Sequence, residues 1–348
     1  VGYDYGGFYF MRSGWGADDN YLAFDGGHLG TAHVHQDKLT FELSAYGKNL
    51  IVDSGKMTYN IDKWREYVVS SASHNVMLAD GKGQNRTYSP SAVSPVPVTD
   101  TKFLTSKYFD FVSGIFNDGY GSEKDKSVSH ERNIFFAKPG YWIFHDVANV
   151  TSGEHVIDEL FQFAPMKVII DDKTKAAYTD NIGEANLRII PVDINGLEVD
   201  VAEGMEDPVR GWVSPEYGEK DSAPQVKYTR NNVNSNTSFD FVLYPTEPGI
   251  NSDINVERLP VVRRGKVLTT DIASAIKVSA SHKGVNDYIL ISDTDPEKAE
   301  KTFGTSSKDQ IKTDAEIAFV SLDAATNEAK AVTLVNGQNL SDNNNYRI

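Results

Sequence analysis

Short segments rich in β-branched and aromatic residues recur along the whole chain, and this pattern constrains the fold more than any other feature. They lie at residues 7–12, 39–45, 49–53, 74–79, 133–136, 141–147, 156–163, 187–191, 239–244 and 288–292, and most are bounded by Gly, Pro, Asn or Asp. Helical periodicity over three turns or more is hard to find. Many short strands separated by turn residues are typical of antiparallel sandwiches. We therefore predict an all-β chain that forms a large antiparallel β-sandwich.

The length and composition allow a large core. The chain has 348 residues, of which 40% are hydrophobic and 24% are charged, so most of it is expected to be folded. We expect a main β-sandwich that carries the functional site over residues 1–250. Residues 251–348 are expected to add closing strands to it or to form a small C-terminal β-domain. Polar stretches at 172–181 and 218–236 predict loops, and residues 343–345 predict a loose tail.

The net charge of −15 bears on the partners. Nucleic acid and anionic membranes would meet a repulsive field, so neither is an expected partner. A polyanionic sugar chain meets the same repulsion unless basic residues gather locally. The basic residues near the polar motifs are Arg12, Lys38, Lys63, Arg65, Lys82 and Arg86. No apolar run approaches the roughly 18 residues that a membrane span needs. The chain begins at Val1 without Met, so we expect that a signal peptide or a preceding domain has been removed.

One polar cluster predicts chemistry. The run Gly30-Thr31-Ala32-His33-Val34-His35-Gln36-Asp37 is followed by Asp53, eighteen residues after His35, and then by Ser73-His74-Asn75. Imidazole and carboxylate are usual zinc ligands, and histidine is the commonest acid or base near neutral pH. The chain has no cysteine, so these are the strong metal ligands available. Each residue also has a structural interpretation, since Asp-Ser-Gly is ordinary turn chemistry and a histidine can cap a turn.

The strand pattern limits how these residues can meet. Alternation from Leu39 predicts a strand that starts near Lys38, and residues 47–49 predict a hairpin loop. If that strand ran back through His35, Asp53 would lie roughly 26 Å from His35 at about 3.3 Å per residue. A shared metal ion therefore requires residues 33–37 to form a loop that folds back over the sheet end. A three-residue hairpin loop would bring Asp53 to the face of Leu43, and a two-residue loop would reverse that, so the register stays open.

Several motifs together resemble a known family. Three runs carry the resemblance, namely HVHQDKLTFELSAYGKNLIVDSG, Trp64-Arg65-Glu66-Tyr67 and SASHNVMLADG. They are similar to the C-terminal β-domain of heparinase II/III-type polysaccharide lyases. The resemblance covers roughly residues 6–165. It implies that His35, Asp53 and His74 hold a zinc ion, mainly as a structural element. It also places His33 in the catalytic cleft, with Tyr59 or Tyr67 as a second catalytic residue. The expected substrate-binding residues are Arg12, Arg65 and Asn75.

The resemblance implies a lyase that cleaves a uronic-acid-containing polysaccharide, such as heparan-like glycosaminoglycan or alginate, by β-elimination. It implies a bacterial protein that is periplasmic or secreted. Lyases of this type also have an N-terminal α/α toroid that forms one wall of the cleft, and this sequence has no such helical region. Either the toroid is a separate or cleaved piece, or the chain is a β-only relative with a binding role. Val34 stands where the family usually has glycine, and Gln36 at an often small position, which affects specificity more than fold.

Three hypotheses therefore stand. The chain is the β-sandwich part of a polysaccharide lyase, a non-catalytic carbohydrate-binding sandwich with a structural metal, or a metal-dependent hydrolase in which zinc activates water. Only elimination creates a conjugated unsaturated uronate, so the ultraviolet absorbance of the product separates the first hypothesis from the other two.

Overall fold

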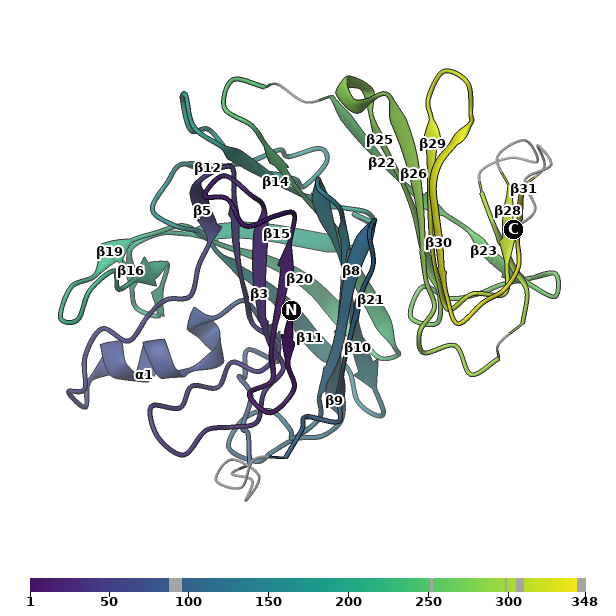
Figure 1. Cartoon of the computed structure of the whole chain (residues 1–348). Helices are drawn as coiled ribbons and strands as arrows, with labels where there is room; N and C mark the ends of the chain where they lie inside the picture. The colour runs from purple at the N-terminus through teal and green to yellow at the C-terminus, as the bar shows by residue number, and fades with distance from the viewer. Residues whose placement is uncertain (88–95, 251–252, 298, 305–309, 343–348) are drawn as a thin grey trace. The chain divides into compact units, whose positions relative to one another are not determined.

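The chain forms two compact units, Val1–Ile250 and Asn251–Ile348. The computed structural model describes residues 1–87, 96–250, 253–297, 299–304 and 310–342 (Figure 1), so the tail expected at 343–345 lies outside the described residues. Every strand pair in these ranges is antiparallel, which confirms the all-β prediction. In the part of the chain that the structure describes, helix is confined to α1 (Lys63–Val69) and to single 3-10 turns such as η1 (Ser71–Ser73) and η3 (Ser281–Lys283). Within the described ranges, no helix is both long and apolar enough to cross a bilayer.

Three sheets build the first unit. In spatial order, the five-stranded sheet is β1 (Gly2–Tyr3), β2 (Phe8–Arg12), β3 (Tyr21–Asp25), β4 (Phe41–Ala45) and β5 (Lys48–Ile51). The eight-stranded sheet is β12 (Val168–Ile170), β13 (Ala177–Thr179), β14 (Asn186–Pro191), β21 (Thr237–Thr246), β10 (Tyr141–Val150), β9 (Val128–Ala137), β8 (Phe109–Phe116) and β7 (Thr101–Thr105). The four-stranded sheet is β15 (Leu197–Ala202), β20 (Gln225–Val233), β11 (His155–Gln162) and β6 (Met77–Ala79). Two small hairpins follow β15, namely β16 (Met205–Glu206) with β17 (Val209–Arg210), and β18 (Trp212–Val213) with β19 (Asp221–Ser222).

A continuous aromatic core joins the three sheets. The ring of Phe41 on β4 lies 4.5 Å from that of Phe144 on β10, and Phe144 lies 6.5 Å from Phe161 on β11. Phe161 in turn contacts Phe241 on β21 at 5.2 Å. All four side chains are buried. Each such ring contributes about 1.5–3 kcal/mol when it leaves water, and together they fix β4, whose preceding loop carries the histidines, against the rest of the sandwich.

The hairpin that leads to Asp53 differs from the expectation. The strand begins at Phe41 and not near Lys38, because Leu39 has a left-handed backbone (φ 74°) that breaks the extended chain. The turn consists of Tyr46 and Gly47, with φ of 50° and 77°, which is the two-residue type whose twist matches antiparallel strands. The prediction of a hairpin loop at residues 47–49 was therefore wrong. A bulge between the pairs Leu43↔Ile51 and Ser44↔Asn49 then shifts the register by one residue.

Two segments expected as loops contain strands. β13 lies within residues 172–181, and the nine-residue strand β20 lies within residues 218–236. In β20 the apolar side chains of Val226 and Tyr228 are fully buried, while Lys227 between them is partly exposed. β20 is a central strand that lies between β15 and β11. Its strand pattern was not recognised in the sequence because polar residues occupy its outward positions.

The second unit is a smaller β-structure with its own core. One five-stranded sheet has the order β22 (Ile254–Leu259), β25 (Ser274–Ala280), β26 (Val285–Ile291), β29 (Ile317–Asp323) and β30 (Ala329–Val335). The other has the order β24 (Lys266–Val267), β23 (Val261–Arg263), β27 (Lys301–Phe303), β28 (Ile311–Thr313) and β31 (Leu340–Asp342). Side chains from both sheets, including Leu290 and Phe303, form one buried cluster.

Candidate metal centre and catalytic pocket

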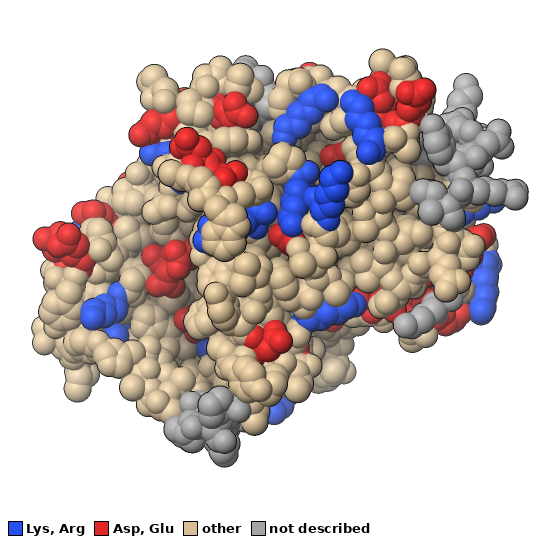
Figure 2. All heavy atoms as spheres, in the orientation of Figure 1, with Lys and Arg blue, Asp and Glu red and all other residues tan. Residues whose placement is uncertain are grey.

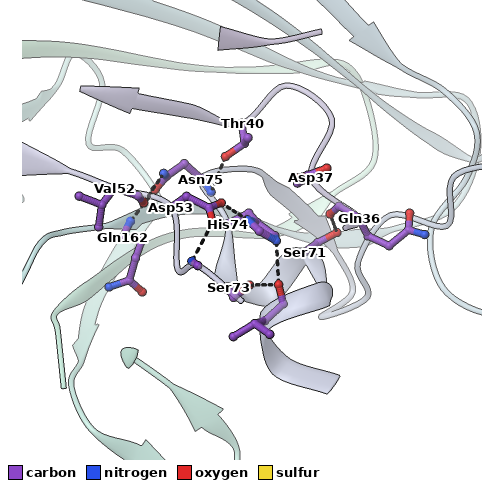
Figure 3. Close-up of polar contacts among 12 residues, drawn as sticks. Gln36, Asp37, Thr40, Val52, Asp53, Ser71, Ser73, His74, Asn75 and Gln162 are labelled. Atoms are coloured by element: carbon purple, nitrogen blue, oxygen red, sulfur yellow. Dashed lines mark hydrogen bonds and ion pairs between the residues drawn. The ribbon is translucent and has the colours of Figure 1, made fainter. Parts of the chain in front are cut away.

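Residues 33–37 form a loop, which is the condition that a shared metal site required. None of them lies in a strand. Gln36 fixes the loop, because its backbone N–H donates to the carbonyl of Val69 at 2.9 Å and its carbonyl accepts from Ser71 Oγ at 2.5 Å. Its side-chain Oε1 accepts from the backbone N–H of Arg86 at 2.8 Å. One glutamine thus connects the histidine loop to the end of α1, to η1 and to the segment after β6. Figure 3 shows its contact with Ser71 of η1.

The structure brings the three expected metal ligands together. Ligand atoms of His35, Asp53 and His74 all lie within 4.8 Å of one another. His74 Nδ1 lies 2.6 Å from Asp53 Oδ2 (Figure 3). The rings of His35 and His74 are 5.2 Å apart. His74 is fully buried, while the other two are partly exposed. The three residues come from a loop, from the end of β5 and from the turn that follows α1.

Asp53 serves two purposes. Its Oδ1 accepts from the backbone N–H of Gly55 at 2.8 Å, which is the turn chemistry expected of Asp-Ser-Gly. Its Oδ2 faces His74. The structural and the functional interpretation of this aspartate therefore hold together, since a carboxylate has two oxygens.

The electrostatics of the cluster suit a cation. Burial lowers the pKa of the His74 ring, but the charge of Asp53 and its hydrogen bond outweigh burial and raise that pKa to about 9. Burial acts to raise the pKa of Asp53, but His74 and the bond from Gly55 lower it below its usual value. Burial, followed by the charge of His74, lowers the pKa of His35. The carboxylate is thus held ionised beside two imidazoles, with positive charge favoured at His74.

The donor set fits zinc. Two imidazoles and one carboxylate form a known three-ligand zinc set. His74 Nε2 lies 3.1 Å from the carbonyl oxygen of Val68, and this oxygen can only accept, so Nε2 carries a proton and Nδ1 is left to face Asp53. A ligating histidine usually has such a partner on its second nitrogen, which fixes the tautomer and the ring orientation. Zinc held by His35, Asp53 and His74 remains a prediction.

His33 lies beside Tyr59 and apart from the three ligands. Its Nδ1 is 2.7 Å from Tyr59 Oη, and the two rings meet edge to face with centroids 5.6 Å apart. Both side chains are exposed, Tyr59 by 46%. The alternative tyrosine, Tyr67, is buried on α1, and burial raises its pKa to about 12. Its hydroxyl faces the carbonyl of Trp212 at 3.4 Å. Of the two candidates, only Tyr59 is in contact with His33.

The three expected substrate-binding residues lie in different places. Arg65 is near the pair, with its guanidinium 5.2 Å from the ring of Tyr59. Arg12 is stacked on Trp15 and Tyr21. It is the last residue of β2 and lies roughly 13 Å along the strand from the first residue, Phe8, at about 3.3 Å per residue.

The position of Asn75 differs from the expectation that it binds substrate. It is fully buried, and its side-chain amide donates to the carbonyls of Phe41 (2.8 Å) and Val52 (3.0 Å). Its Oδ1 accepts from the backbone N–H of Gln162 at 2.6 Å. With every polar group committed to backbone, Asn75 joins β4, β5 and β11 beneath the site and is closed to substrate (Figure 3).

A pocket of about 440 Å³ opens beside these residues. Its lining includes His33, His35 and Asp37 from the loop and Asp25, His28 and Arg86 from outside it. Arg86 is buried and pairs with Asp37 at 3.0 Å. Burial, together with the charge of Asp37, raises the pKa of Asp25 to about 6. The pocket thus combines imidazoles, a guanidinium and a carboxyl group that titrates near neutrality.

Sequence reasoning missed Asp25, His28 and the anchoring role of Gln36. A signal for Asp25 was present, since it ends a strand and is followed by Gly26-Gly27, and its Oδ1 accepts from the Gly27 N–H at 2.7 Å. No local pattern marks Gln36, because its partners lie between 33 and 50 residues away.

Comparison with known proteins bears on this arrangement. A family profile described as "Heparinase II/III-like, C-terminal" matches residues 2–242. A heparin-sulfate lyase of Bacteroides stercoris is 24% identical over 239 residues, which cover 67% of this chain and 31% of the relative. The heparin-sulfate lyase of Pedobacter heparinus is 23% identical over 245 residues, which cover 69% of this chain and 34% of the relative.

Solved structures show the same fold. The crystal structure of heparan sulfate lyase HepC from Pedobacter heparinus matches with a TM-score of 0.64 and 19% identity, over 82% of this chain and 41% of that one. A crystal structure of heparinase III matches with a TM-score of 0.62 and 16% identity, over 82% and 41%. The chain spans about a third of the length of the curated relatives. Because the profile covers residues 2–242 of 348, this protein belongs to the heparinase II/III-like C-terminal family.

Proposed function

We propose that this chain is the β-sandwich part of a polysaccharide lyase that cleaves a uronic-acid-containing polysaccharide by β-elimination, with a bound zinc ion. The proposal rests first on the hydrogen bond of 2.7 Å between His33 Nδ1 and Tyr59 Oη at an exposed site. His33 also lines the pocket that the candidate metal ligand His35 lines. Family membership, with heparin-sulfate lyases as relatives, supports the same reaction class.

The chemistry requires a base and an acid close together. The base removes the C5 proton, which lies α to the uronate carboxylate, and the electron pair forms the C4–C5 double bond as the C4–O bond breaks. The acid then gives a proton to the departing sugar oxygen. His33 and Tyr59 share a hydrogen bond, so each is placed to hold or release one of these protons. We assign the two roles to this pair.

The intermediate anion needs a positive neighbour, because the C5 proton is only weakly acidic while the carboxylate charge is unscreened. Arg65 lies over the ring of Tyr59 at 5.2 Å and is the nearby cation that we assign to substrate binding. Lys56 lies 5.2 Å from the ring of Tyr59 and 5.3 Å from that of Tyr217. Both tyrosines are exposed, so aromatic faces and cations adjoin the reacting pair.

The surface as a whole does not attract polyanions. The net charge is −15, and on the face in Figure 2 acidic and basic side chains are interspersed. Substrate must therefore be recognised by local contacts such as those around Tyr59 and not by a long-range field.

Zinc is assigned a structural role. His35, Asp53 and His74 would hold it, and its binding would connect the histidine loop to the end of β5 and to the turn after α1. When bound it supplies a fixed positive charge that cross-links three segments, so its binding energy adds to folding energy. The backbone segment that carries His33, two residues from His35, would then be held rigidly.

The remaining assignments follow the family. We propose that an α/α-toroid domain or chain forms the opposite wall of the cleft, that the substrate is an acidic polysaccharide such as a heparan-like glycosaminoglycan or alginate, and that the protein acts in the bacterial periplasm or after secretion. A non-catalytic carbohydrate-binding sandwich is the second candidate, favoured by the exposed aromatic rings of Tyr59 and Tyr217.

The test is a product assay. The chain, alone and together with the polypeptide encoded directly upstream, is incubated with a panel of uronate polymers while ultraviolet absorbance and reducing ends are followed. Elimination gives both signals, and His33→Ala should reduce the rate roughly 10²–10⁴-fold. Reducing ends without absorbance would indicate a hydrolase. Saturable binding of a polymer without either signal would support the binding module.

A further inference from the structure

We propose that Arg132, a buried residue of β9, is the positioning residue that holds the two segments carrying His35 and His74 in register. This inference rests on the proposed metal site and names a residue that does not touch it. Arg132 is fully buried, and its Nη1 donates to the carbonyl of Leu39 at 2.8 Å and to that of Asn75 at 2.5 Å. Leu39 ends the histidine loop, and Asn75 follows His74 directly.

The two segments meet where Arg132 reaches them. The backbone N–H of Asn75 donates to Thr40 Oγ1 at 3.2 Å, and the Asn75 amide donates to Phe41. Leu39 has a left-handed backbone, which is unfavourable for a residue with a side chain. Its carbonyl direction is therefore unusual, and the guanidinium supplies the partner that this direction needs. A change in the position of Arg132 would move both carbonyls together.

The guanidinium is itself held rigidly. Its Nε donates to Asp146 Oδ1 at 2.7 Å and its Nη2 to Glu159 Oε2 at 2.9 Å. Asp146 also accepts from His130 Nε2 at 2.9 Å. These partners come from β10, β11 and β9, so the cluster anchors Arg132 to two of the three sheets. A lysine could keep the charge but has no planar fork to bridge two carbonyls and two carboxylates.

The same cluster contains a second group with metal-ligand geometry, His130, Asp146 and Glu159. Arg132 already donates three hydrogen bonds to the two carboxylates, at 2.7, 3.2 and 2.9 Å. A divalent ion between them would face the guanidinium at close range. The carboxylates of this group therefore bind the guanidinium of Arg132, and the group is not a second metal centre.

The experiment compares Arg132→Lys with Asp240→Asn. Asp240 on β21 lies 2.8 Å from His145 on β10 and accepts from Ser238 Oγ at 2.9 Å, so its substitution also disturbs a buried hydrogen bond of the same sheet, at partners that belong to neither the histidine loop nor the segment of His74. Zinc dissociation constants are measured by chelator competition at a temperature where the variants are folded. Arg132→Lys should weaken zinc binding about 10-fold or more, as loss of outer partners of a metal site does. Asp240→Asn should stay within about 2-fold of the unchanged protein.

A second measurement needs no metal. Hydrogen–deuterium exchange of the chelated proteins should rise in peptides covering residues 35–41 and 74–77 in Arg132→Lys and not in Asp240→Asn. If Arg132→Lys does not fold, Asp146→Asn, which loosens one side of the fork, replaces it in both measurements. Unchanged exchange in these peptides would overturn the proposal, and so would equal effects of the test and control variants. If the unchanged protein binds no zinc, the metal site fails, while the exchange result still decides the role of Arg132.

Discussion

His33 and His35 are separated by one residue but have different surroundings. His33 is exposed and contacts Tyr59, whereas His35 is partly buried against His74. The left-handed backbone at His33 (φ 57°) turns the chain between the two side chains. A pattern of histidines at i and i+2 predicts two side chains on one face of a strand, and here a loop gives them two different surroundings.

This difference predicts a separation of effects. His35→Ala should lose most bound zinc and lower the melting temperature, since ligand binding to the folded protein adds to its stability. His33→Ala should leave both nearly unchanged. Elemental analysis of protein never exposed to chelator, with a thermal melt of each variant, is the measurement. Equal zinc loss in both variants would make His33 a ligand and weaken its role in proton transfer.

The two tyrosines allow a matched comparison. Tyr59→Phe removes only the hydroxyl that contacts His33, so turnover of the complete lyase should fall roughly 10²-fold or more while zinc content stays the same. Tyr67→Phe removes a buried hydroxyl whose two contacts, with the carbonyl and the N–H of Trp212, are long at 3.4 and 3.5 Å, and it should change turnover less than about 3-fold. Steady-state rates on the same polymer decide between them. A larger effect at Tyr67 would reverse the assignment.

At the scale of elements, the long buried strands were predictable from the sequence, whereas β13, β20 and the strand bounds near the site were not. Long buried strands such as β10 and β21 are recognisable in the sequence as runs of β-branched and aromatic residues. β4 starts at Phe41 after the left-handed Leu39, whose carbonyl accepts a hydrogen bond from the distant Arg132. The ligand triad was predicted from motifs, but its closure needs hydrogen bonds from Gln36 to residues 33 to 50 positions away, which no local pattern contains.

The junction of β6 and β11 predicts a pH dependence. His155 Nδ1 lies 2.8 Å from Asp80 Oδ2, where Asp80 follows β6. Burial lowers the pKa of His155, but the hydrogen bond and charge of Asp80 outweigh it and raise that pKa above the usual 6.5. The charged pair therefore stabilises the fold fully below about pH 6.5, and this contribution is lost as pH rises through the folded-state pKa.

The measurement is chemical unfolding of the protein and of His155→Gln at pH 6 and pH 9. The variant should be less stable by roughly 1 kcal/mol at pH 6, below the usual range for a hydrogen bond to a charged group because Asp80 is exposed and water screens the pair, and by less at pH 9. As a matched variant, Asp80→Asn removes the partner of His155 and should reduce the pH dependence in the same way. A destabilisation that grows with pH would contradict the sign argued here.

At the scale of the whole molecule, we expect the first unit to supply one wall of a cleft. His33, Tyr59 and Arg65 supply a proton-transfer pair and one cation, while the described part of the first unit contains a single helix, α1, of seven residues. Elimination needs the base, the acid and the carboxylate-neutralising group within about 3 Å of their targets. The exposed pair of His33 and Tyr59 would not by itself hold a flexible sugar chain that closely, so the proposed reaction requires a second wall.

The isolated 348 residues should therefore fold and bind zinc but show little or no lyase activity, which should appear when a helical toroid is joined or added in trans. The contact face should include His33, Tyr59 and Tyr217, which are exposed, and not the buried Tyr67. Tyr217→Ser, remote from the proton-transfer pair in sequence, should weaken the response to the helical part, while Ile182→Ser, at an exposed position between β13 and β14, should not. Full activity of the isolated chain would refute the two-wall account, because one wall would then suffice to order the substrate.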